Sequence, residues 1–174
     1  MSLSELVALL ERLGTVASEG ADGLTELDHG LQCAQELALD RPSDVELQLA
    51  GLCHDIGHEF GPDERHGVLG AEAVRPLLGD RIAELVEAHV VAKRFLAATD
   101  PSYRSVLSNE SRRTLAVQGG PLTPVDAAVF ERVPHFNDAV RLRQADDAAK
   151  VPGRVVPGLD RWLPILRARA GVPR

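Results

Sequence analysis

The chain has few of the residues that stabilise small secreted domains or β-sheet cores. Only 3% of its 174 residues are aromatic, and only two are cysteines. Two cysteines cannot supply a disulfide framework, so we expect Cys33 and Cys53 to be buried free thiols in apolar helical segments. With 44% apolar residues and so few aromatic ones, the core must consist mainly of Leu, Val and Ala. This composition favours helices over a β-sandwich or β-barrel.

Long apolar runs and excess positive charge are also missing. No run approaches the roughly 18 apolar residues of a membrane span, and the segment Met1–Glu5 lacks the basic start of a signal peptide. The net charge of −7 argues against nucleic acid or an anionic membrane as the main partner. We therefore expect a soluble cytoplasmic protein, a single domain over residues 1–174, monomeric or homodimeric, that acts on a small molecule.

The spacing of apolar residues predicts an all-α architecture. Leu6, Leu9, Leu10 and Leu13 form one apolar helical face, and no segment shows the alternation of a half-buried strand. We expect helices over residues 3–16, 25–39, 43–57, 66–78, 82–98, 108–117, 123–132 and 134–150, with Ser43 as the cap of the third, and then an extended segment and a short C-terminal helix containing Trp162.

Histidine is concentrated in one part of the chain, since five of the six histidines lie between His29 and His89. The adjacent pair His54-Asp55 offers an imidazole and a carboxylate, and the two oxygens of a carboxylate can each hold one metal ion. On a helix the two side chains point about 100° apart, so both can face one site only if it lies across the helix end.

The remaining histidines could complete a two-metal cage with a late carboxylate. Nitrogen and oxygen ligands without thiolate suit iron, manganese, zinc or cobalt. Any single histidine could instead be an ordinary core or surface residue, and for His135, which has no partner pattern, we expect the latter. The candidate ligands are His29, His54, Asp55, His66, His89 and Asp146.

Two cations are placed beside these candidate ligands. Lys93 follows His89 by four residues, and Arg143 precedes Asp146 by three, so each shares a helical face with a ligand. An acidic protein that binds a dianion needs such convergent cations, and Arg suits a dianion with several oxygen atoms through bidentate geometry. The alternative is ordinary solvated helix charge.

Several longer segments resemble the HD-domain oxygenases of the PhnZ type, which degrade phosphonates and are related to myo-inositol oxygenase. The H…HD…D pattern is that of the HD-domain superfamily, whose fold is a helical bundle. The further similarity extends from about residue 25 to the C-terminus, and ordinary HD hydrolases lack its later motifs. The segments that carry it are 27–34, 53–58, 89–96, 115–121 and 146–153.

The resemblance implies a mixed-valent Fe(II)/Fe(III) site with dioxygen as co-substrate. One iron would take His29, His54, Asp55 and Asp146, and the other would take Asp55, His66 and His89. The substrate would be a 1-hydroxyalkylphosphonate, 2-amino-1-hydroxyethylphosphonate or an N-methylated or related analogue. Hydrogen abstraction from its hydroxylated carbon would lead to cleavage of the C–P bond, giving phosphate and a carboxylic acid.

The resemblance also implies roles around the substrate. His58, Lys93, Ser111 and Arg143 would hold the phosphonate, and His54, Asp55, His58 and Lys93 would form the catalytic group. For Ser111 a helix cap or surface hydroxyl is the alternative.

Relatives that act on aminoethylphosphonates tend to carry a tyrosine and a glutamate where this chain has Glu19 and Asp22. Glu19 could offer a carboxylate to the iron or to a cationic substrate, or could be a flexible loop acid. Asp22 could suit a bulkier ammonium group, or could mean that no amine is recognised.

Two other classes of function remain as alternatives. A metal-dependent HD-domain phosphohydrolase acting on a nucleotide or another phosphate monoester would share His29, His54, Asp55 and Asp146, and a metal-bound hydroxide would attack phosphorus. A non-catalytic binding module would have a broken ligand set, whereas the set here is complete. The dioxygenase is the leading hypothesis, because Lys93 and the segments 118–121 and 146–150 favour it over the hydrolase.

Overall fold

The computed structural model describes residues 1–171, and within them the fold is all-α, as predicted. The single β-bridge, between Ala17 and Thr25, joins the two ends of the loop between the first two helices. The elements are α1 (Leu3–Leu13), α2 (Glu26–Asp40), α3 (Val45–Cys53), a 3-10 helix η1 (Ile56–Glu59), α4 (His66–Leu78), α5 (Asp80–Thr99), α6 (Pro101–Val106), α7 (Asn109–Val117), α8 (Pro124–Phe130), α9 (Phe136–Ala148) and α10 (Leu159–Arg169).

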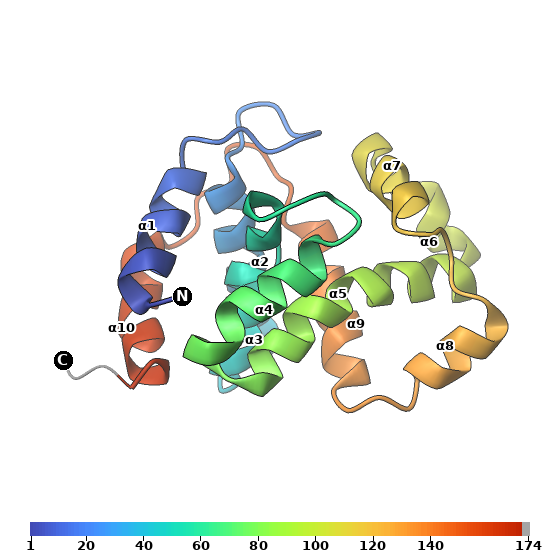
Figure 1. The fold of residues 1–174 in the computed structure, drawn as a ribbon. Coiled ribbons are helices and arrows are strands. Elements are labelled where there is room, and N and C mark those ends of the chain that lie inside the picture. Colours follow the sequence, from blue (N-terminus) through green and yellow to red (C-terminus); the bar gives the residue numbers. More distant parts are fainter. Residues whose placement is uncertain (172–174) are drawn as a thin grey trace.

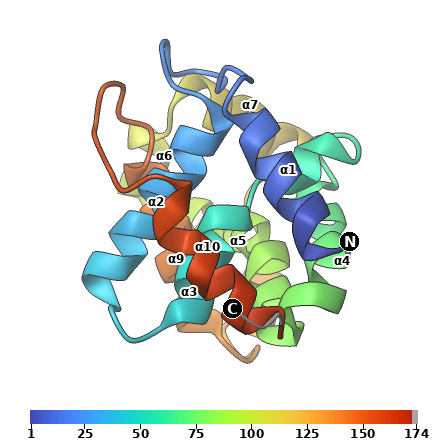
Figure 2. The same ribbon diagram turned by 90° about the vertical axis from the view of Figure 1, so that its left-hand side faces the viewer.

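The long helix α5 is the centre of the packing. It lies against α3, α4 and α9, and α2 packs on α3 and α9. In Figures 1 and 2, α1 and α10 cover one side of this group, while α6, α7 and α8 lie at the opposite end in Figure 1. One continuous apolar core of mainly Leu, Ile, Val and Ala residues extends from Leu6 of α1 to Trp162 and Leu166 of α10.

A smaller apolar cluster attaches α6 and α7 to the end of α5. It consists of Ala97, Tyr103, Leu107 and Leu115. Because this cluster is separate from the main core, the position of α6 and α7 depends on few apolar contacts and on polar contacts toward α9. That arrangement bears directly on the site described below.

Local capping chemistry explains where several helices begin. The side-chain oxygens of Ser2 and Thr25 each accept a hydrogen bond from the backbone amide three residues on, and the backbone amides of Ser2 and Thr25 donate to the acid at that position, which makes two capping boxes. The third helix is capped by Asp44, whose Oδ1 accepts from the Leu47 amide at 3.1 Å, so the expectation of a Ser43 cap was wrong. Both cysteines are buried free thiols, as expected.

One expected helix boundary was wrong, and one helix was not expected at all. The helix expected over 43–57 ends at Cys53, and η1 follows after a change of backbone direction at Asp55, whose φ and ψ are −101° and 0°. The helix expected over 82–98 ends at Thr99, close to the expected position, but α6 follows at once in a segment where no helix was expected. Pro101 is tolerated at the first helical position, and Asp100 accepts from the Ser102 amide at 2.8 Å.

An ion cluster around Arg81 connects three of the packed helices. Its guanidinium donates to Asp44 at 2.7 Å, to Glu46 at 3.1 Å and to Asp138 at 3.0 Å. These acids lie at the start of α3 and of α9, and all four side chains are partly buried. The Arg81 hydrogen bonds hold the pKa of Asp44 below its usual value.

We expect Arg81→Met to lower the free energy of unfolding by about 2 kcal/mol at pH 7, since partly exposed charged hydrogen bonds are worth less than buried ones. A carboxylate with a lowered pKa stabilises the fold above its unfolded pKa and loses that contribution as pH falls through the folded pKa. The difference from wild type should therefore persist to about pH 4 and narrow below it. Urea unfolding at pH 7 and pH 3 measures this, and an equal difference at both values would contradict it.

Candidate metal centre and substrate pocket

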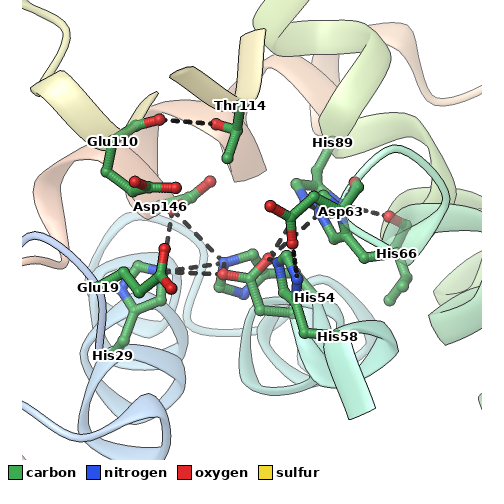
Figure 3. Close-up of polar contacts among 12 residues, drawn as sticks. Glu19, His29, His54, His58, Asp63, His66, His89, Glu110, Thr114 and Asp146 are labelled. Atoms are coloured by element: carbon green, nitrogen blue, oxygen red, sulfur yellow. Dashed lines mark hydrogen bonds and ion pairs between the residues drawn. The ribbon is translucent and has the colours of Figure 1, made fainter. Parts of the chain in front are cut away.

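Five elements bring the six candidate ligands to one place. His29 lies on α2, His89 on α5 and Asp146 on α9, and His66 is the first residue of α4. His54 caps the end of α3. All are buried except Asp55, which is half-buried. Figure 3 shows the histidine rings and Asp146 directed toward a common centre.

The four buried imidazoles are all fixed in the same way. In each the Nδ1 atom contacts a backbone carbonyl oxygen, which can only accept, so Nδ1 carries the proton and the Nε2 lone pair points to the centre. This is the arrangement of metal-binding histidines. The acceptors are the carbonyls of Ala149 for His29 (3.5 Å), Gly51 for His54 (2.8 Å), Asp63 for His66 (2.6 Å) and Val86 for His89 (2.5 Å).

Asp55 lies between two pairs of histidines. Its Oδ2 is 3.4 Å from Nε2 of His29 and 3.2 Å from Nε2 of His54. Its Oδ1 is 3.5 Å from Nε2 of both His66 and His89. Because the backbone leaves the helix at Asp55, this side chain can face the same centre as His54 although the two are adjacent in sequence.

The spacing of these atoms fits shared cations. Nε2 of His29 and His54 lie 3.1 Å apart, and Nε2 of His66 and His89 lie 3.0 Å apart. Two lone pairs at this distance repel each other unless a proton or a cation lies between them. Ligand atoms about 2.0–2.2 Å from one ion are separated by roughly 3–3.5 Å. Asp146 Oδ1 completes the first group, 3.0 Å from His29, and His29, His54, Asp55 and Asp146 all offer atoms within 4.8 Å of one another.

Burial and the nearby carboxylates shift the pKa values of the four histidines in opposite directions. Burial lowers the pKa of all four rings, but for His29 and His54 the carboxylates Asp55 and Asp146 outweigh burial and raise it. For His66 burial and the neighbouring His89 lower the pKa to about 3. The first pair thus competes with protons for a metal, whereas the second is neutral at ordinary pH.

His58 stands beside this centre. Its ring stacks on that of His66, with centroids 4.1 Å apart and an angle of 11°. Its Nδ1 is 3.1 Å from Asp63 Oδ1 and its Nε2 is 3.8 Å from Asp55 Oδ1. His135 lies at the start of α9, near Asp138 and away from the centre.

A hollow of about 260 Å³ opens onto the centre. Of the residues assigned to substrate, His58, Lys93, Ser111, Arg143 and Glu19 all line it. Asp22 is exposed and lies outside its lining. Lys93 is buried, donates to Thr114 Oγ1 at 2.9 Å, and has a pKa lowered to about 8 by burial and by Arg143.

Comparison with known proteins identifies the family of this chain. The HD domain model matches residues 28–113. A hydroxymethylphosphonate dioxygenase of Gimesia maris is 36% identical over 152 residues, which cover 81% of this chain and 75% of the relative. The chain belongs to the HD-domain dioxygenases of the PhnZ type.

Two further proteins are similar to the present dioxygenase. A [1-hydroxy-2-(trimethylamino)ethyl]phosphonate dioxygenase (glycine-betaine-forming) of Leisingera caerulea is 33% identical, over 83% of this chain and 78% of the relative. An uncharacterised protein of Acanthamoeba polyphaga mimivirus is 30% identical, over 91% of this chain and 77% of its own length. Within residues 1–171 the dioxygenase has no helix that is both long enough and apolar enough to span a membrane.

The structure adds an ion cluster at the hollow that the sequence did not suggest. Arg113 of α7 donates to Glu110 at 2.6 Å and to Asp63 at 2.7 Å, and it lies 3.4 Å from Glu19. All four side chains line the hollow, and Figure 3 shows Glu19, Asp63 and Glu110 around it. The acids come from three segments distant in sequence, so no local pattern could have revealed them.

Further lining residues could have been found from spacing. Thr114 and Gln118 follow Ser111 by three and seven residues, which places all three on one face along α7 and its C-cap. Oε1 of Gln118 is buried and has no hydrogen-bond partner within residues 1–171. Lys150 also lines the hollow.

Gly57 permits the close approach that forms the centre. A Cβ atom there would lie 1.8 Å from the His66 carbonyl oxygen and 2.7 Å from the Gly70 amide nitrogen. Both atoms belong to the backbone of α4, so η1 could not stay against α4 with a larger residue. His58 and His66 are the side chains that this contact brings together.

We expect Gly57→Ala to lower the free energy of unfolding by about 3 kcal/mol or more and to weaken metal binding, because backbone must move to relieve the overlap. Gly158→Ala is a matched control, since nothing lies within 4 Å of a Cβ at that position. Urea unfolding and metal titration measure both effects. Wild-type metal affinity in a stable Gly57→Ala protein would show that the contact does not shape the centre.

Proposed function

We propose that this protein is a di-iron dioxygenase that cleaves the C–P bond of a 1-hydroxyalkylphosphonate bearing a cationic amino group. The candidates are 2-amino-1-hydroxyethylphosphonate and its N-methylated analogues, with phosphate and a carboxylic acid as products. The observation that carries the proposal is the position of Asp55, which directs one oxygen to the His29–His54 pair and the other to the His66–His89 pair. The phosphonate dioxygenases among its relatives support the reaction class.

The donor set fits two iron ions. His29, His54, Asp55 and Asp146 would hold one, and Asp55, His66 and His89 the other. Imidazole and carboxylate without thiolate suit iron, and the buried lone pairs and carboxylates need positive charge to compensate them. When bound, the irons would activate dioxygen for oxidation of the hydroxylated carbon.

The phosphonate would bind on the cationic wall of the hollow. Lys93 and Arg143 are buried there, and His58 and Ser111 stand beside them. A buried ammonium and guanidinium hold a dianion strongly because little water screens them. They would orient the substrate so that its hydroxylated carbon faces the metal centre.

The acidic cluster favours a cationic group on the rest of the substrate. Arg113 supplies one positive charge to Glu19, Asp63 and Glu110, so this cluster keeps a net charge of about −2 if all three acids are ionised. The hollow thus offers two cations, Lys93 and Arg143, of which Arg143 is also paired with Asp146 and Asp147, and it is net negative at the cluster. Metal ions bound at the carboxylates would leave these cations available to the phosphonate, and the cluster would then complement an ammonium group. Glu19 is the least engaged acid, with its side chain 71% exposed, and is the best placed to pair with an ammonium group.

We expect His89→Ala to bind one metal equivalent where the wild-type protein binds two, and to lose turnover, because only the second group of ligands is broken. His135→Ala is the control and should bind two equivalents, since His135 lies away from the centre. Elemental analysis after loading with iron under anaerobic conditions measures this. Two tightly held equivalents in His89→Ala would contradict the proposed second ligand group.

We expect the iron-loaded protein to release phosphate from 2-amino-1-hydroxyethylphosphonate or its N-trimethyl analogue in air but not under strict anaerobiosis. Hydroxymethylphosphonate, which has no cationic group, should react with a higher KM. The measurement is phosphate release over this panel, with phosphate monoesters included. Oxygen-independent release from monoesters alone would instead establish the HD-domain phosphohydrolase.

Glu19→Gln tests whether the acidic cluster recognises the ammonium group of the substrate, independently of C–P bond cleavage. It should raise KM for the cationic substrates about tenfold, the order expected for losing one charged contact, and leave KM for hydroxymethylphosphonate unchanged. Glu11→Gln makes the same charge change on the exposed face of α1 and should alter neither. If Asp22→Asn raised KM for the cationic substrates and Glu19→Gln did not, Asp22 would be the residue that recognises the amine.

A further inference from the structure

Arg143 forms part of the wall between two hollows. Beyond the hollow at the metal centre lies a second one of about 490 Å³, which shares Ser111, Arg143, Asp146 and Lys150 with it. Tyr103 of α6 and Asp147 of α9 line only the second hollow. They therefore contact Arg143 from the side that faces away from the centre.

A closed set of hydrogen bonds fixes the guanidinium. Nε of Arg143 donates to Tyr103 Oη at 2.9 Å and to Asp147 Oδ2 at 3.1 Å. The Tyr103 hydroxyl donates in turn to Asp147 Oδ2 at 2.7 Å. Nη2 of Arg143 donates to Asp147 Oδ1, and Nη1 donates to Asp146 Oδ2 at 2.6 Å.

Burial makes this arrangement restrictive. Arg143 is 5% exposed and Tyr103 is 9% exposed, so the guanidinium has little room to take another rotamer. Burial raises the pKa of Tyr103, and the hydroxyl therefore stays neutral and can donate to Asp147 while it accepts from Nε. A long side chain loses much rotamer freedom when it is fixed. In Arg143 this rotamer freedom is already lost in the folded protein, so binding a ligand need not cost it again.

We propose that Tyr103 and Asp147 are positioning residues that hold Arg143 ready for the phosphonate group. The inference rests on the proposed function, because it takes Arg143 as a phosphonate ligand. Tyr103 and Asp147 touch neither the substrate nor the metal ions in this scheme, and they act only through Arg143. The bond from Nη1 to Asp146 also fixes Arg143 relative to a candidate metal ligand.

Tyr103→Phe tests the proposal, because it keeps the aromatic ring in the cluster with Leu107 and Leu115 and removes only the hydroxyl. KM for the phosphonate should rise about tenfold, with kcat changed less than about twofold and iron content unchanged. Ser105→Ala removes a hydroxyl from the same helix, one that bonds only to the Ser102 carbonyl, and should change neither constant. A lower unfolding temperature with an unchanged KM would mean that Tyr103 is only structural.

A double-mutant cycle tests whether Tyr103 affects KM through Arg143. The Arg143→Lys change removes the Nε–H group that donates to the tyrosine hydroxyl. If Tyr103 acts through Arg143, adding Tyr103→Phe to Arg143→Lys should raise KM little further. Additive effects of the two changes would overturn the proposal. Absence of phosphonate turnover by wild type with iron and oxygen would reject the proposed function instead. An active wild type with an unaffected Tyr103→Phe would reject only the positioning role.

Discussion

The structure depends on a group of imidazole and carboxylate lone pairs that are largely buried and point to one centre. Four imidazoles direct Nε2 at two carboxylates, and each ring is prevented from turning away because its Nδ1 contacts a backbone carbonyl. Burying carboxylates without compensation is costly, so this centre is complete only with cations in it. The packing of α2, α3, α4, α5 and α9 around one point follows from the need to supply those six side chains.

The second organising feature is the separation of charge within an acidic protein. The net charge of −7 repels a phosphonate at long range, yet the cationic wall of the hollow is buried. Lys93 and Arg143 therefore act at short distance, where water screens least. Arg113 compensates one of the negative charges of the cluster that Glu19, Asp63 and Glu110 form. Under the proposed function, such a site would favour a substrate that carries an ammonium group as well as a phosphonate.

The fold class and most helices were predictable because apolar spacing and capping residues are local signals, and these are strong in α1 and α2. The ligand residues could be named from the His-Asp pair and the resemblance it supports, although not their geometry. A continuous helix through His54-Asp55 would have separated the two side chains, whereas the backbone at Asp55 turns them to one centre. Nothing local indicates that contact between η1 and α4, because it depends on Gly57 meeting the backbone of α4.

The substrate side was harder to predict for a physical reason. Few side chains can replace the candidate metal ligands, and five of the six lie between residues 29 and 89, so their pattern can be recognised in the sequence. Glu110 and Arg113 are neighbours on α7, but Glu19 and Asp63 join them only through tertiary structure. Tyr103 reaches Arg143 from α6, a helix that was not predicted from the sequence. Although α6 and α7 rest on a separate small cluster, α6 is joined to a candidate ligand through Arg143, which bonds to both Tyr103 and Asp146. The proposed substrate side and the candidate metal centre are therefore coupled through one guanidinium.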